Sequence, residues 1–132
     1  MTQEQKDLLL KDLCSRLPYA VKCDVGDNKP YTLIRIEIND KNGHILDFKE
    51  KKDGLNMQVY LSEVKPYLFP LDSMTEEQDK EFALLQTSPG QECFLYAWNC
   101  ANMMKWLIEN NFDYNGLIPH GLANDATGKN IY

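Results

Sequence analysis

The sequence has no long apolar run and no cysteine pair at metal-binding spacing. No stretch approaches the roughly 20 apolar residues that a membrane-spanning helix needs. Near the N-terminus, residues 8–10 form too short a run for a signal peptide. The four cysteines include no Cys-x-x-Cys motif. We therefore expect reduced thiols, a cytoplasmic location and no association with a membrane.

Active-site motifs are also missing. There is no Gly-x-x-x-x-Gly-Lys loop to hold a phosphate. Cys93 or Cys100 would form a thiol–imidazole pair with His44 or His120 only through tertiary contact. Cys100 also lies on an apolar helical stripe, where burial raises the pKa of a thiol. We therefore expect no enzymatic activity, no catalytic residue and no cofactor.

Metal ligands are equally sparse. Cys93 and Cys100 would lie about 10 Å apart along a helix, which is too far for one zinc ion without further ligands. The acidic side chains of Asp24 and Asp27 lack the glycine and closing glutamate of an EF-hand loop. We predict a solvated turn there and no metal site.

The charge is unevenly distributed along the chain. Residues 1–72 hold 12 acids and 11 bases, a net charge of −1, whereas residues 73–132 hold 8 acids and 3 bases, a net charge of −5. Such a surface repels phosphate backbones, so we do not expect nucleic acid as a partner. Besides a hydrolase built around Cys93 or Cys100, two alternatives stay open: an acidic DNA mimic that inhibits a host nuclease or restriction system, and a nucleic-acid binder that uses a barrel face and the basic residues within 49–52.

The N-terminal part predicts one helix and a set of short strands. Thr2 and Gln5 form a capping box for a helix over residues 3–16, with Cys14 on its apolar stripe and with Asp12 and Arg16 on its polar face. Alternating apolar residues then predict five strands, at 21–25, 31–38, 44–49, 55–61 and 66–69. In the second of these, Ile34, Ile36 and Ile38 are expected to share one face of the strand, and Leu33 to lie on the other.

The connections between these strands are too short for parallel crossovers. We therefore predict an antiparallel SH3-like barrel or curled meander, with a 3₁₀ turn before its last strand. Near Pro70 the apolar period changes from two to helical spacing. Thr75 with Gln78, or Ser73 with Glu76, would cap a helix at 76–86.

A longer helix follows at 93–110, with Asn110 and Asn111 at its C-cap. Residues 112–123 are rich in turn residues and in large apolar side chains, so we expect them to dock on the helices. Residues 124–132 are polar, and we expect their end to fray. The whole chain, 1–132, is predicted to be one compact α+β domain, with a helix-plus-barrel part at 1–72 and a helical part at 73–132.

Aromatic side chains are the candidates for a binding surface. We expect Phe69, Trp98 and Phe112 to be buried. The amphipathic aromatics at the predicted margins are the possible partner-binding residues. These are Trp106, Tyr114, Tyr132 and Tyr67.

Three blocks of the sequence resemble small uncharacterised proteins of Bacteroides genomes and their prophages. The blocks are residues 8–19, residues 64–77, and residues 112–118 with 121–123. The resemblance implies a phage or mobile-element setting and brings no activity and no site residue. With no catalytic constellation and an acidic helical half, we expect a non-enzymatic accessory protein that acts by protein–protein interaction.

Overall fold

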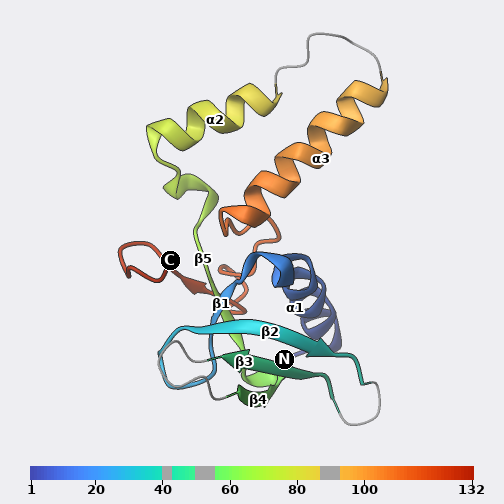
Figure 1. Ribbon diagram of the computed structural model, residues 1–132, viewed down its shortest axis with the longest axis vertical. Coiled ribbons are helices and arrows are strands. Elements are labelled where there is room, and N and C mark those ends of the chain that lie inside the picture. The colour runs from blue at the N-terminus through green and yellow to red at the C-terminus, as the bar shows by residue number, and fades with distance from the viewer. Residues whose placement is uncertain (40–42, 50–55, 87–92) are drawn as a thin grey trace.

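The chain folds into a helix and a six-stranded sheet, from which a pair of helices projects (Figure 1). The computed structural model describes residues 1–39, 43–49, 56–86 and 93–132, with residues 93–96 described in their backbone alone. The α+β class expected from the sequence is confirmed.

The first helix, α1 (Gln3–Arg16), begins at the predicted capping box. Gln5 N donates to Thr2 Oγ1 at 3.1 Å, and Thr2 N donates to Gln5 Oε1 at 2.9 Å. Leu9 and Leu13 pack into the core of the sheet. A 3₁₀ turn, η1 (Leu17–Tyr19), extends the helix past Arg16.

Two expectations for α1 are wrong. Asp12 and Arg16 are fully buried rather than on a polar face, whereas Cys14 is exposed rather than in the core. The polar pair is buried because other parts of the chain cover this side of α1 and supply hydrogen-bond partners, which periodicity cannot reveal.

The sheet is open and mixed. Its strands lie in the order β4-β3-β2-β1-β5-β6, and the first five pair antiparallel. They are β1 (Lys22–Asp24), β2 (Tyr31–Glu37), β3 (Ile45–Lys49), β4 (Asn56–Tyr60), β5 (Lys65–Leu68) and β6 (Asn124–Asp125). In the described part of the chain the edge strands β4 and β6 do not pair with each other. A closed five-stranded barrel is therefore wrong.

The sixth strand comes from the C-terminal segment. β6 pairs parallel to β5, with Tyr67 opposite Asn124, and Ala126 N donates to the Leu68 carbonyl at 2.8 Å. A strand of two residues carries no periodic signal. For that reason the sequence pattern predicts a frayed end where the structure has a sheet edge.

A register shift in β2 changes which residues face the core. The shift lies between Leu33 and Arg35. Leu33 is buried, but Ile34 and Ile38 are 41% and 57% exposed. The prediction that Ile34 and Ile36 share a face opposite Leu33 is wrong, because the extra residue lies between them: Ile36 packs against the core on the side of Leu33, whereas Ile34 is turned outward. Ile38 follows the last residue of β2.

The predicted 3₁₀ turn, η2 (Leu61–Glu63), lies between β4 and β5 as expected. After β5, a second such turn, η3 (Leu71–Ser73), leads to the helix α2 (Glu76–Gln86). Thr75 and Gln78 form its capping box, with the two hydrogen bonds at 3.0 and 3.2 Å. Of the two caps considered, this is the one formed.

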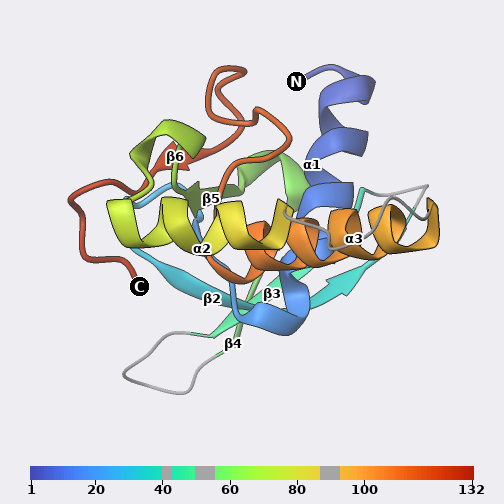
Figure 2. The same cartoon turned by 90° about the horizontal axis from the view of Figure 1, so that it is seen from above.

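The helices α2 and α3 (Cys93–Glu109) form a hairpin that projects away from β3 and β4 (Figure 1). Seen from above, the two helices extend across the body of the molecule (Figure 2). The rings of Phe82 and Trp106 join them, with centroids 5.4 Å apart. Asn111 ends α3 in the left-handed conformation, at φ 60°, which confirms the expected C-cap.

The segment after α3 docks, as expected, but its backbone hydrogen bonds to the body join it to the end of β5 rather than to the helices. Phe69 N donates to the Asn111 carbonyl at 2.8 Å, and Asp113 N donates to the Phe69 carbonyl at 2.9 Å. Asp113 then accepts from the N–H groups of Leu117 and Ile118, at 2.8 and 2.9 Å. These bonds fix the base of the hairpin to the sheet.

No helix in the described ranges is both long and apolar enough to cross a bilayer.

Candidate functional site

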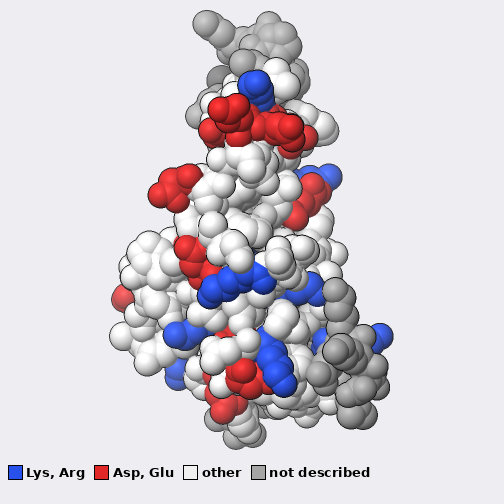
Figure 3. Space-filling view, turned by 90° about the vertical axis from the view of Figure 1, so that its left-hand side faces the viewer, with Lys and Arg blue, Asp and Glu red and all other residues white. Residues whose placement is uncertain are grey.

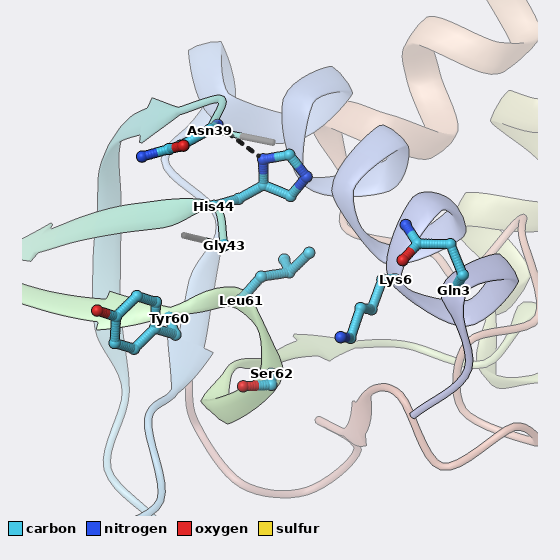
Figure 4. A pocket seen from close by; sticks show the side chains of 8 residues that line it. All are labelled: Gln3, Lys6, Asn39, Gly43, His44, Tyr60, Leu61 and Ser62. Atoms are coloured by element: carbon cyan, nitrogen blue, oxygen red, sulfur yellow. Dashed lines mark hydrogen bonds between the residues drawn. The ribbon is translucent and has the colours of Figure 1, made fainter. Parts of the chain in front are cut away.

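A cavity lies between the start of α1 and the adjoining ends of β3 and β4 (Figure 4). We call it the α1–β3 pocket. Its volume is about 420 Å³, which is within the range of small-molecule sites. Its lining residues are Gln3, Lys6, Asn39, Gly43, His44, Tyr60, Leu61 and Ser62.

Three elements bring these residues together. Gln3 and Lys6 lie three positions apart and therefore share one side of α1. Gly43 and His44 lead into β3, where Gly43 has a φ of 86° that favours glycine. Leu61 N donates to the His44 carbonyl at 3.1 Å, which joins the β3 and β4 walls of the pocket.

The pocket is rich in hydrogen-bond donors. The Asn39 N–H donates to His44 Nδ1 at 3.1 Å, so a neutral His44 ring carries its proton on Nε2. The ring lies at the α1 side of the pocket, and the Lys6 side chain extends from α1 into the same space (Figure 4). Ser62 adds a hydroxyl, whereas the Gln3 amide already donates to Asp7, at 2.8 Å.

Lys6 is the single charged side chain among the described lining residues. Within the described ranges it forms no ion pair. A positive pocket of this kind is unexpected in a chain with a net charge of −6. Its chemistry suits a negatively charged group, because Lys6 supplies charge and His44 and Ser62 supply neutral donors.

The four aromatic residues predicted to bind a partner all contact other parts of the chain. Tyr67 is buried, and its carbonyl accepts from the Tyr132 hydroxyl at 2.7 Å. The Tyr114 hydroxyl lies 2.9 Å from Ser15 Oγ, and its ring lies beneath the Arg16 guanidinium, at 5.1 Å. None of the four lines the α1–β3 pocket.

Trp106 and Tyr132 belong to a row of aromatic rings. Trp106 stacks on Phe112 at 5.5 Å, Phe112 contacts Phe69 at 6.1 Å, and Phe69 contacts Tyr132 at 6.0 Å. The Trp106 indole N–H also donates to Glu81, at 3.3 Å. The row stabilises the junction between the hairpin and the body.

Trp98 is a large aromatic side chain of the hairpin that remains exposed to solvent. It is 66% exposed, so the prediction that it is buried is wrong, whereas buried Phe112 is confirmed and Phe69 is half-buried. The apolar stripe of α3 is too wide for α2 and the body to cover completely. Exposed residues on one side of α3 define what we call the α3 stripe: Ala97, Trp98, Ala101, Met104 and Lys105.

The cysteines and histidines do not assemble a reactive site among the described side chains. Cys23 is fully buried, and burial raises the pKa of its thiol. His44 lines the pocket with Asn39, while His120 Nδ1 lies 2.7 Å from the Gly116 carbonyl. The Cys93 side chain lies outside the described residues. The described part of the chain also holds no group of three or more His, Cys, Asp or Glu suited to a metal ion.

The sequence pattern does not indicate the pocket residues. Among them it suggests only His44, and only as a partner for a cysteine. Lys6, His44 and Ser62 are separated by tens of residues and meet only through tertiary packing. No local motif marks such a site.

No known protein family, curated protein or solved structure matches the chain. Its function is therefore inferred from the geometry of the hairpin and the pocket.

Proposed function

We propose that the protein is a non-enzymatic accessory protein of a phage or mobile element, and that it acts by binding another protein through the α3 stripe. The observation that carries this proposal is the 66% exposure of Trp98 on a projecting helix. Tryptophan is enriched at the energetic centres of protein interfaces. Ala97, Ala101 and Met104 extend the apolar surface on the same side of α3.

The partner we propose has an apolar groove bordered by Lys or Arg side chains. The described parts of α2 and α3 hold five acids, Glu76, Glu77, Asp79, Glu81 and Glu109, against Lys80 and Lys105, a net charge of −3. On the face in Figure 3, acidic side chains gather over the hairpin, while Lys and Arg lie among the acids of the body. Charge complementarity across an interface favours the correct partner and speeds association.

A second copy of the chain fits this surface less well, because two hairpins of charge −3 repel each other. An acidic DNA mimic is the rival function. We rank it second because a mimic needs acids spaced like phosphates along one face, whereas the acids in Figure 3 form a few separate groups with uncharged and basic side chains between the groups. A nucleic-acid binder that uses residues 49–52 ranks third, because a chain with a net charge of −6 repels a phosphate backbone.

We further propose that the first five strands are related to SH3-like folds. The strand order β4-β3-β2-β1-β5 and the 3₁₀ turn η2 before β5 support this relation. A relation of fold carries no function by itself.

The experiment places a photo-crosslinking amino acid at position 98, in cells that naturally contain the protein. We expect a specific crosslinked product, which mass spectrometry identifies. The purified partner is then titrated with the intact protein by calorimetry. Binding should weaken as salt is raised, because the acidic flanks contribute to it.

Matched substitutions decide whether the α3 stripe is the interface. Trp98→Ala should weaken binding by about 2 kcal/mol or more. Ile38→Ala serves as the control, since it removes an apolar side chain of similar exposure, 57%, at the end of β2. Equal effects of the two substitutions, or a partner whose contact surface is acidic, would rule out the proposal.

A further inference from the structure

We infer that the α1–β3 pocket binds a small monocarboxylate with a short apolar body. This site is separate from the α3 stripe and does not depend on it. The inference rests on one unpaired lysine, two neutral donors and an apolar wall around a cavity of about 420 Å³.

The charge of the pocket selects the charge of the ligand. Lys6 supplies one positive charge, and no acidic side chain is among the described residues that line the space. One lysine neutralises a monoanion, whereas a phosphate dianion would keep an uncompensated charge in a half-enclosed site. A carboxylate therefore fits better than a phosphate.

The neutral donors fix where the carboxylate lies. The Asn39 N–H occupies His44 Nδ1, which leaves the Nε2–H of the neutral ring to donate to a ligand. The Ser62 hydroxyl comes from the other wall, on η2. A carboxylate has two acceptor oxygens, so Lys6, His44 and Ser62 together can satisfy them.

The apolar part of the pocket lining is the reason for expecting a ligand with an apolar body. A carboxylate alone fills a small part of the cavity, and the rest is bounded by Leu61, Gly43 and the ring of Tyr60. A side chain at position 43 would occupy this space, since a Cβ built on Gly43 lies 3.5 Å from the Tyr60 ring. Burial of a short aliphatic or aromatic group against these residues would add to the affinity.

The test is a titration of the ¹⁵N-labelled full chain with 3-phenylpropionate, followed by two-dimensional NMR. We expect saturable shifts of the Gly43 and Ser62 amides at millimolar concentrations. The neutral probe 3-phenylpropanamide has nearly the same shape without the charge, and phenyl phosphate carries a larger charge. Both should bind at least about tenfold more weakly than 3-phenylpropionate.

Three substitutions assign the donors. Lys6→Gln should weaken binding of 3-phenylpropionate by about tenfold, whereas Lys11→Gln removes the same charge from an exposed site on α1 and should change nothing. His44→Asn keeps an acceptor for the Asn39 N–H but removes the Nε2 donor, so it should also weaken binding. The native spectrum of each variant shows that it is folded.

Other outcomes would overturn the inference. Absence of saturable shifts in the folded wild-type protein would show that the pocket has no carboxylate affinity. Equal binding of the amide would show that charge is not recognised, and tighter binding of phenyl phosphate would exclude the monoanion. Equal effects of Lys6→Gln and Lys11→Gln would place the ligand elsewhere.

Discussion

Arg16 Nε donates to Asp12 Oδ2 at 2.8 Å, and both side chains are fully buried. The same pair reaches the C-terminal part of the chain, because Arg16 Nη2 donates to the Phe112 carbonyl at 2.7 Å and Asn115 Nδ2 donates to Asp12 Oδ1 at 2.9 Å. One ion pair on α1 therefore holds together segments about a hundred positions apart.

The first prediction concerns this pair. Asp12→Ala leaves the Arg16 charge buried without its counter-ion, and such a loss costs about 3–5 kcal/mol of unfolding free energy. Urea denaturation, followed by circular dichroism, measures it. Glu109→Gln is the control, since it removes an exposed pair of 3.6 Å with Lys105 and should cost under about 1 kcal/mol. Similar losses in the two variants would contradict the buried network.

The second prediction separates the two tryptophans. Trp98 is 66% exposed, whereas Trp106 is half-buried between Phe82 and Phe112. Trp106→Phe retains Trp98 alone, and we expect its fluorescence to be strongly quenched by acrylamide. Trp98→Phe retains Trp106, which should be quenched less and emit at shorter wavelength. If both variants are quenched to the same degree, the hairpin does not pack as described.

The sequence predicts elements well where a local signal exists. The caps at Thr2, Thr75 and Asn111 are all formed, because a cap depends on a few neighbouring residues. The bulge that turns Ile34 outward and the strand β6 have no such signal. Both depend on strand pairing, which tertiary contacts decide.

The candidate site shows the same division. Trp98 fits an apolar helical stripe, and the sequence alone cannot say how much of that stripe finds a covering surface. Lys6 and Ser62 each look like ordinary solvated residues until η2 and β3 place them on one cavity. The sequence identifies His44 only as a possible partner of a cysteine thiol. In the described part of the chain its ring instead accepts a hydrogen bond from the Asn39 N–H.

The third prediction concerns pH. The Tyr31 hydroxyl donates to Asp27 Oδ2, and this bond, with a smaller contribution from the Lys29 N–H, holds the pKa of that carboxyl below its ordinary value. A pKa lower in the folded than in the unfolded chain stabilises the fold above the unfolded pKa. The contribution is lost as pH falls through the folded pKa.

Tyr31→Phe should therefore raise the pKa of Asp27, as followed by NMR titration of its carboxyl carbon. The pKa of Asp125 is also lowered, by hydrogen bonds from Thr127, and should not change in this variant. Tyr31→Phe should also lower the stability of the fold near neutral pH, because it removes the bond to the Asp27 carboxylate. This loss should vanish in strong acid, where Asp27 is protonated in both the folded and the unfolded chain. An unchanged Asp27 pKa would exclude Tyr31 as the cause.

The fourth prediction uses the thiols. Cys23 is fully buried at the centre of the sheet, and burial raises its pKa, while Cys14 is exposed on α1. With Cys93 and Cys100 changed to serine, iodoacetamide at neutral pH should label Cys14 first. Cys23 should react only when the sheet opens, so its labelling reports on the stability of the core. Peptide mapping by mass spectrometry distinguishes the two sites.

The same labelling provides an independent test of the Asp12–Arg16 pair. When opening is fast relative to the reaction, the labelling rate follows the population of the open state. A loss of 3 kcal/mol in Asp12→Ala should then accelerate Cys23 labelling by about a hundredfold. Cys14 should label at nearly the same rate in both proteins, because it is already exposed in the native fold. If Cys23 is labelled as fast as Cys14 in the protein that retains Asp12, β1 is not enclosed between β2 and β5 in solution.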